Sequence, residues 1–299
     1  KLTPIARFFG VKELVITILG VSVLSSLPEL TVSLAAGLAG ESEISIANVV
    51  GSNFVTLTFV TAFCALIAPM VIQRETRDRE SAWMILSSTA ILILALDGEL
   101  GRLDGVVLIL LYIPYIATVV RDASRDSKNQ PAGEKDQKAA GKGIIWHFVF
   151  IFLAIAGIIA GARIALAGGV KMGKDLGISD VVLGILIFAF GTSLPEFAIA
   201  LSATFRKKAE ISISEIYASN IFTAMAVLGF VCLVTPMPVS PAIMKFDLPF
   251  ILLAGSVVQI FVTTGSKLVR LEAIVIMAIY IYFILGHFIP ELPISAFVK

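Results

Sequence analysis

One unusual phrase occurs twice in this chain, each time inside a long apolar stretch. Residues 25–37 read SSLPELTVSLAAG and residues 192–204 read TSLPEFAIALSAT, an offset of 167. The segments that follow, 43–56 and 210–223, match at the same offset without a gap. A match of this kind indicates an internal duplication. We therefore expect the chain to fold as two copies of one unit.

The composition places both copies in a membrane. The 299 residues are 58% hydrophobic and 15% charged, and several runs reach the roughly 20 apolar residues that span a hydrocarbon core. The sequence predicts an all-α, polytopic membrane protein, in a plasma (cell) membrane and multi-pass. Nine crossings are expected, near residues 11–39, 44–72, 81–96, 106–120, 145–168, 178–204, 211–236, 247–264 and 268–290.

Charges in the loops predict the orientation of these spans. If every span crosses, one side holds 17 Lys and Arg residues and the other holds five. The positive-inside rule then places residues 1–12 and the polar segment 121–143 in the cytoplasm. The basic residues lie in short loops and the net charge is +1, so no nucleic-acid partner is expected.

The span count makes the duplication an inverted one. Five crossings separate the first copy of the motif from the second, so the copies enter the membrane from opposite faces. Inverted repeats with broken helices are typical of secondary transporters, whose substrate sites lie near the midplane. The predicted division is a first half at 1–120 with four visible helices, a cytoplasmic loop at 121–144, and a second half at 145–299 with five helices. We expect five helices per repeat, so the first helix of the first repeat is missing from this chain.

The doubled motif combines a helix breaker with a carboxylate. Pro28 and Pro195 each lack an N–H, so each breaks its helix and frees backbone carbonyls. Glu29 and Glu196 follow directly, and a charge at the bilayer centre costs about 3 kcal/mol on insertion scales. These side chains need a cation, a proton or a watery cavity. Paired carboxylates and carbonyls form an all-oxygen site that suits Ca²⁺ and also suits protons.

Further polar residues recur at the same offset in the neighbouring spans. Individually such side chains often bond an adjacent helix, but their duplication favours a shared cavity and ion pathway. The candidates are Ser26, Ser193, Ser52, Asn53, Thr56, Ser219, Asn220, Thr223 and Glu215. Glu215 stands where the first copy has Asn48, and a proton relay, a group flanking the site and a solvated helix end all remain open for it.

These residues resemble a known family. GTSLPEF at 191–197 and SSLPEL at 25–30, each followed by a GSN-like segment, resemble the alpha repeats of the calcium/cation antiporter superfamily. That superfamily includes sodium/calcium and proton/calcium exchangers, and the resemblance covers essentially the whole chain. It implies alternating access, with Ca²⁺ bound by Glu29 and Glu196 and by backbone oxygens of Ser25 and Thr192.

The chain departs from the sodium/calcium branch at two positions. That branch often places Asn or Asp where this chain has Thr56 and Thr223. Fewer anionic ligands make several Na⁺ ions harder to hold, whereas two glutamates can exchange one Ca²⁺ for two H⁺. This chain also does not resemble the proton/calcium exchangers that carry a Gly-Asn motif. Proton coupling is therefore preferred, Na⁺/Ca²⁺ exchange is the alternative, and a cation channel is a weaker one.

Other chemistry is not expected. His147 and His287 lie at span ends with no nucleophile beside them, and Cys64 and Cys232 lie in apolar segments without metal-ligand spacing. The sequence thus predicts no enzyme and no cofactor. The expected partners are Ca²⁺, a counter-cation (H⁺ or Na⁺) and the lipid bilayer.

Overall fold

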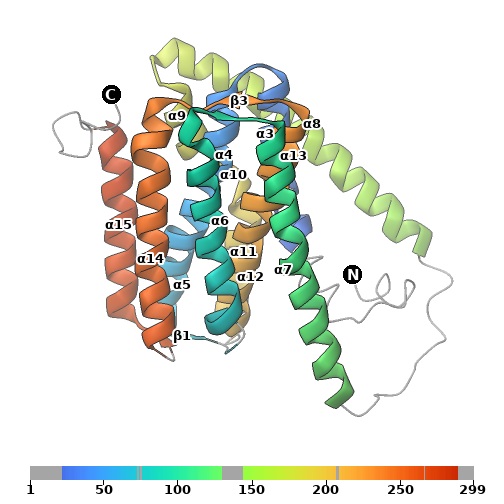
Figure 1. Ribbon diagram of the computed structural model, residues 1–299, viewed down its shortest axis with the longest axis vertical. Coiled ribbons are helices and arrows are strands. Elements are labelled where there is room, and N and C mark those ends of the chain that lie inside the picture. Colours follow the sequence, from blue (N-terminus) through green and yellow to red (C-terminus); the bar gives the residue numbers. More distant parts are fainter. Residues whose placement is uncertain are drawn as a thin grey trace.

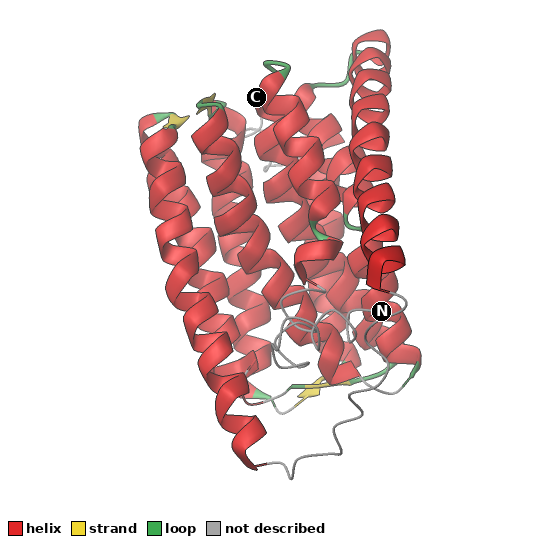
Figure 2. Ribbon diagram, turned by 90° about the vertical axis from the view of Figure 1, so that its right-hand side faces the viewer, coloured by secondary structure: helices red, strands yellow, loops and turns green. Residues whose placement is uncertain are grey.

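A computed structural model describes residues 22–72, 74, 76–129, 144–206, 209–265 and 267–288. Most helices run side by side along one direction in both views (Figures 1 and 2), while α8 (Ile144–Leu176) crosses them obliquely in Figure 1. The first half contains α3 (Leu27–Leu38), α4 (Ser42–Val55), η1 (Thr56–Val60), α5 (Thr61–Ile67), β1 (Met70–Val71), η2 (Thr76–Glu80), α6 (Ser81–Leu94), η3 (Ala95–Asp97), β2 (Glu99–Leu100) and α7 (Arg102–Asn129).

The second half begins with the long helix α8. Its elements are α8 (Ile144–Leu176), α9 (Asp180–Val182), η4 (Leu183–Ala189), α10 (Phe190–Thr192), α11 (Leu194–Phe205), α12 (Ala209–Ile221), η5 (Phe222–Val227), α13 (Leu228–Val234), β3 (Met237–Pro238), η6 (Ile243–Asp247), α14 (Leu248–Thr264), β4 (Lys267–Leu268) and α15 (Arg270–Phe288). The η3 segment is a 3₁₀ turn, and the other η segments are π-helical.

Both prolines of the doubled motif lie at the start of a new helix. Residues 22–25 are helical, Ser26 is a turn, and α3 then begins with Pro28 in its first two positions. The same break occurs at Ser193, between α10 and α11. There the two parts, Asp180–Thr192 and Leu194–Phe205, are bent by 46°. The predicted helix breaks are present because proline cannot continue the preceding hydrogen-bond ladder.

Two short strand pairs lie at opposite ends of the bundle. β1 pairs antiparallel with β4, and Met70 faces Leu268. β2 pairs antiparallel with β3, and Leu100 faces Met237. We call the end with β1 and β4 the near end and the end with β2 and β3 the far end; β1 and β3 lie at the bottom and top of Figure 1. Since Met70 and Met237 differ by 167 positions, equivalent segments occupy opposite ends, as an inverted repeat predicts.

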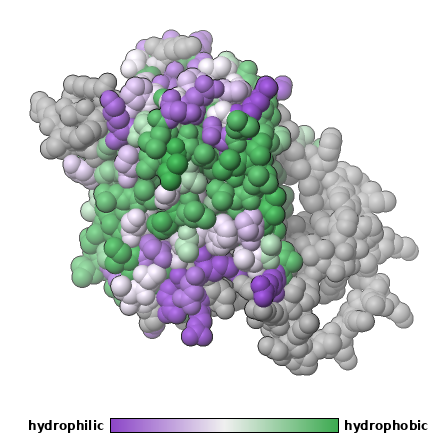
Figure 3. Space-filling view, in the orientation of Figure 1, coloured by the Kyte–Doolittle hydropathy of each residue, from purple (hydrophilic) through white to green (hydrophobic). Residues whose placement is uncertain are grey.

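The surface has the hydropathy of a membrane protein. A hydrophobic band crosses the molecule between two more polar ends (Figure 3). Among the described residues, six helices are long and apolar enough to span a membrane, or seven if the bent pair at Ser193 counts as one span. The all-helical polytopic fold is thus confirmed. The count of nine stays a prediction, and residues 11–21 of the first predicted span lie outside the described residues.

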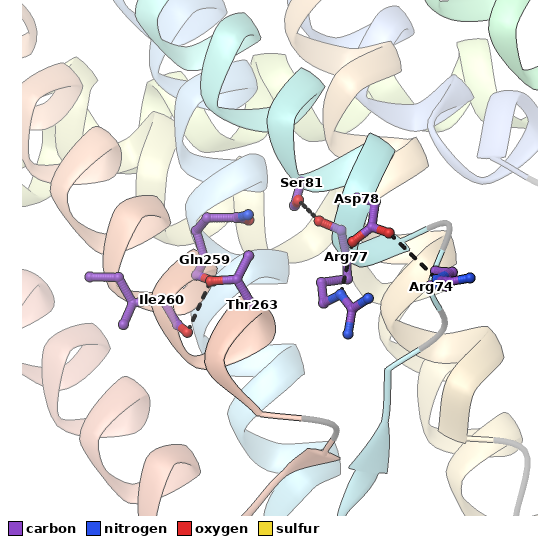
Figure 4. Close-up of polar contacts among 7 residues, drawn as sticks. All are labelled: Arg74, Arg77, Asp78, Ser81, Gln259, Ile260 and Thr263. Atoms are coloured by element: carbon purple, nitrogen blue, oxygen red, sulfur yellow. Dashed lines mark hydrogen bonds and ion pairs between the residues drawn. The ribbon is translucent and has the colours of Figure 1, made fainter.

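Charged side chains gather at the near end. Arg77 Nε lies 2.8 Å from Asp78 Oδ1, and Arg74 Nε lies 3.9 Å from Asp78 Oδ2 (Figure 4). On a neighbouring helix, the Thr263 hydroxyl donates to the Gln259 carbonyl at 2.8 Å. The two arginines belong to the set that predicts a cytoplasmic location for this end.

The predicted cytoplasmic loop begins later than expected. The sequence predicts a loop from residue 121, but α7 continues to Asn129. Charges of opposite sign three residues apart, as at Asp122 and Arg125, are compatible with helix, and a polar composition alone does not end one. Residues 130–143 lie outside the described residues, and the division into two halves stays a prediction.

A close helix crossing holds the centre of the fold together. A Cβ added to Gly184 on η4 would lie 2.5 Å from the Ala47 Cβ on α4. A Cβ added to Gly51 on α4 would lie 2.8 Å from the Ala189 Cβ on η4. Only glycine at these positions allows the two backbones to approach so closely. The crossing brings the polar side chains of α4 against the break at Ser193.

Candidate ion-binding site

The two motif glutamates are buried in the first turns of α3 and α11. Glu29 is 2% exposed and Glu196 is 1% exposed, and the two carboxylates repel each other electrostatically. In the described part of the chain, the Oε2 atom of each has no hydrogen-bond partner. No Lys, Arg or His among the described residues forms an ion pair with either one. Their charge therefore has no fixed counter-charge there.

Each glutamate accepts a hydrogen bond from the helix break of the other copy. The Ser26 hydroxyl donates to Glu196 Oε1 at 3.0 Å, and the Ser193 hydroxyl donates to Glu29 Oε1 at 3.5 Å. Ser26 and Ser193 are equivalent at the offset of 167. The two motifs thus form one hydrogen-bonded cluster, in which each break donates a hydroxyl group to the glutamate of the other copy.

The residue directly before each of these serines makes a second contact between the copies, and these two contacts are also equivalent. The Ser25 hydroxyl donates to Glu215 Oε1 at 3.2 Å, and the Thr192 hydroxyl donates to Asn48 Oδ1 at 3.3 Å. The structure therefore places Glu215 beside the site, in a buried position, and the solvated helix end is excluded for it. Asn48 was not among the candidates, although its equivalence to Glu215 is visible in the sequence.

Ser52 on α4 and its equivalent Ser219 on α12 make different hydrogen bonds in the two copies. The Ser219 hydroxyl donates to Glu196 Oε1 at 3.2 Å and lies 2.9 Å from the Ser26 hydroxyl. Its equivalent Ser52 instead donates to the Val49 carbonyl of its own helix at 3.0 Å. Glu196 consequently has more hydroxyl neighbours than Glu29.

The asparagines join α4 to α12. Asn53 Nδ2 donates to the Asn220 carbonyl at 3.2 Å, and Asn220 Nδ2 donates to the Asn53 carbonyl at 3.2 Å. The Thr56 hydroxyl donates to Asn220 Oδ1 at 2.6 Å. Thr223 is buried on η5, and among the described residues no hydrogen bond joins its side chain to this network. For the asparagines and Thr56, the contacts favour the alternative of a bond between adjacent helices.

The arrangement offers oxygen ligands to a hard cation. The described residues contain no group of three or more His, Cys, Asp and Glu residues placed to hold a metal. An ion here would instead be bound by two carboxylates together with hydroxyl and carbonyl oxygens. Such oxygen-only sets suit Ca²⁺, Na⁺ and protons, and a buried carboxylate without a partner is costly unless one of them is present.

A second polar pair was not predicted from the sequence. His287 Nε2 lies 3.1 Å from Asp247 Oδ1, and both side chains are 1% exposed. Asp247 directly precedes α14 and His287 lies in the last turn of α15, so the pair joins these helices at the far end. The equivalent of Asp247 is Glu80, which lies 3.2 Å from Arg79 at the near end. The offset of 167 between Glu80 and Asp247 is visible in the sequence and could have singled out Asp247 as a candidate.

Comparison with known proteins gives consistent matches. A family model described as sodium/calcium exchanger protein matches residues 2–121 and 146–288. The chain is 30% identical over 256 residues to the inner membrane protein YrbG of Escherichia coli (strain K12), covering 84% of this chain and 78% of that protein. It is 27% identical over 322 residues to the sodium/calcium exchanger MaX1 of Methanosarcina acetivorans, covering 96% and 92%.

A solved structure also matches over nearly the full length. The sodium-calcium exchanger NCX_Mj, soaked with Na⁺ and Sr²⁺, superposes with a TM-score of 0.68 and 26% sequence identity. The match covers 95% of this chain and 90% of that chain. The similarity therefore extends through both halves of the sequence and through the site described above.

Proposed function

The chain belongs to the sodium/calcium exchanger protein family, and on that premise we propose that it exchanges Ca²⁺ for protons by alternating access. The relatives named above are exchangers or membrane proteins. YrbG is named an inner membrane protein, which supports a plasma-membrane location for this chain.

One observation carries the proposal of a Ca²⁺ site. Glu29 and Glu196 are buried at two helix breaks, and each has a carboxylate oxygen without a partner among the described residues. Ca²⁺ takes six to eight oxygen ligands, among which carboxylates and backbone carbonyls are common. The proposed ligands are these two side chains with backbone oxygens of Ser25 and Thr192. The hydroxyls of Ser26, Ser193 and Ser219 orient the carboxylates.

The neutral residues around the carboxylates favour H⁺ as the counter-ion. Thr56 and Thr223 stand where a sodium-coupled relative would often have Asn or Asp, and the Thr56 hydroxyl already donates to Asn220. Two carboxylates can bind one Ca²⁺ or two protons with the same total charge. Protons and Ca²⁺ then compete for the same oxygens, which is the requirement for exchange.

Sodium coupling is the second candidate, and the comparisons favour it. MaX1 and NCX_Mj are both named as sodium/calcium exchangers, and they match most of this chain. Hydroxyl and carbonyl oxygens of the kind found at Ser25, Ser26 and Ser219 are also suitable ligands for Na⁺.

The test is ⁴⁵Ca²⁺ uptake into proteoliposomes with either a pH gradient or a Na⁺ gradient imposed. We expect a pH gradient without Na⁺ to drive Ca²⁺ uphill, with uptake that saturates as Ca²⁺ rises. Uphill transport driven by Na⁺ alone and insensitive to pH contradicts proton coupling and supports the second candidate. Uptake that does not saturate and needs no counter-ion indicates a channel.

A further inference from the structure

Glu215 is a third buried carboxylate, and only one copy of the repeat has it. It lies on α12, one helical turn before Ser219, with 7% of its surface exposed. The equivalent residue in the first copy is Asn48, which is fully buried. The two positions are therefore alike in place and burial but differ in charge.

Their contacts differ in the same way. Asn48 Nδ2 donates to the Ser33 hydroxyl at 2.9 Å and to the Glu29 carbonyl at 3.4 Å, and its Oδ1 accepts from Thr192. Glu215 Oε1 accepts from Ser25 at 3.2 Å, whereas Oε2 has no hydrogen-bond partner within the described residues. The amide is thus satisfied by protein groups, and the carboxylate has one oxygen free for a ligand.

No fixed positive charge balances Glu215 in the described part of the chain. Glu196 on α11 repels it. The other charged or titratable groups described on elements packed against α12 are four residues of η2 (Arg77, Asp78, Arg79 and Glu80) and Cys64 on α5. On η2, Arg77 pairs with Asp78 at 2.8 Å and Arg79 pairs with Glu80 at 3.2 Å. A buried carboxylate without a counter-charge is costly. A small mobile cation can supply the missing charge.

We propose that Glu215 is a third cation-binding carboxylate, and that it holds one monovalent cation, a proton or Na⁺, which leaves when Ca²⁺ binds. Ser25 contacts Glu215 while the adjacent Ser26 contacts Glu196, so the two carboxylates share one segment of chain. A divalent ion between Glu29 and Glu196 attracts the Glu215 carboxylate and repels a cation bound to it. This inference rests on the proposed function, because it assumes that Ca²⁺ binds between the two motif glutamates.

The test is Ca²⁺ binding by the purified full chain in detergent, without transport. At fixed Na⁺ concentration, the slope of log Kd for Ca²⁺ against pH counts the protons released per Ca²⁺. At fixed pH, the slope against log Na⁺ concentration counts the Na⁺ ions released. Kd should fall as pH rises and rise with Na⁺ concentration, so the counts are the magnitudes of the two slopes. We expect the wild-type magnitudes to sum to more than two, because the two negative charges of Glu29 and Glu196 balance two monovalent cations at most.

Variants assign the additional cation. Glu215→Gln should lower one slope by about one; a lower pH slope identifies a proton, and a lower Na⁺ slope identifies Na⁺. Glu215→Asp keeps the carboxylate and should keep both slopes, as should the control Glu43→Gln, a half-buried carboxylate in the first turn of α4.

The outcomes separate this inference from the proposed function. A wild-type sum of two or less overturns the inference even if no variant folds. Unchanged slopes in Glu215→Gln, or an equal loss in Glu215→Asp, also overturn it. If the slopes behave as expected but neither gradient drives Ca²⁺ into proteoliposomes, exchange is rejected and the role of Glu215 in binding stands.

Discussion

Replacing Gly184 by alanine should damage the site without changing any charge. The added Cβ would lie 2.5 Å from the Ala47 Cβ and 3.2 Å from the Ile44 carbonyl oxygen. Ordinary contacts begin near 3.4 Å, so α4 and η4 must separate by almost 1 Å. Overpacking of this kind typically costs about 1–3 kcal/mol of stability.

The separation should also reduce transport. The same two elements carry Asn48 and lead into Thr192, whose side chains bond at 3.3 Å. A displacement of about 1 Å at a site that depends on geometry can cost on the order of 100-fold in rate. The displacement in Gly184→Ala can be shared among several side chains, so we expect a smaller loss. Ca²⁺ transport should be slower by roughly tenfold or more.

The matched control is Gly161→Ala on α8, where an added Cβ meets nothing within 4 Å. Both variants make the same chemical change in a helix. The measurements are thermal unfolding in detergent and initial rates of ⁴⁵Ca²⁺ uptake in proteoliposomes. If Gly184→Ala and Gly161→Ala unfold and transport alike, the close crossing of α4 and η4 does not position the site.

Three further predictions concern coupling, stability and orientation. Replacing Thr56 by Asn and Thr223 by Asp should add Na⁺ sensitivity to Ca²⁺ uptake; uptake that stays indifferent to Na⁺ would show that these positions do not choose the counter-ion. Asp247→Ala removes the carboxylate that lies 3.1 Å from the buried His287, so the free energy of unfolding should fall by about 3–5 kcal/mol. A loss below about 1 kcal/mol in denaturation experiments argues against a structural role for this pair. A cysteine at Ser127 should react with an impermeant thiol reagent from the cytoplasmic side, and one at the exposed Leu176 from outside; reaction of both from one face contradicts the predicted topology.

The helix breaks and the burial of the motif glutamates could be predicted from the sequence. The doubled motif predicts helix breaks at Pro28 and Pro195, and the structure has both breaks next to those residues. It also predicts that Glu29 and Glu196 lie in the membrane-embedded interior, where they are buried. A constant offset identifies equivalent residues, and proline chemistry is local, so both can be read without coordinates.

The contacts between the copies could not be predicted in this way. The offset pairs Ser26 with Ser193, but it does not say that each donates to the glutamate of the other copy. It likewise pairs Ser52 with Ser219, which bond differently. These contacts depend on how closely the helices approach, and that distance is set by packing at residues such as Gly184.

Long-range pairs were missed for the same reason. His287 and Asp247 are 40 positions apart and meet only because α14 and α15 lie side by side. The polar composition after residue 120 predicts a loop, but α7 continues to Asn129, because polar residues can also satisfy helical hydrogen bonding.

The most direct test of the account is Ca²⁺ transport by Glu29→Gln and Glu196→Gln. Glutamine keeps the shape of the side chain and removes the charge that a divalent ion requires. We expect each variant to remain folded and membrane-inserted, as judged by gel filtration, and to lose ⁴⁵Ca²⁺ uptake into proteoliposomes under either gradient. Uptake by either folded variant near the wild-type rate would contradict the assignment of that glutamate to the Ca²⁺ site.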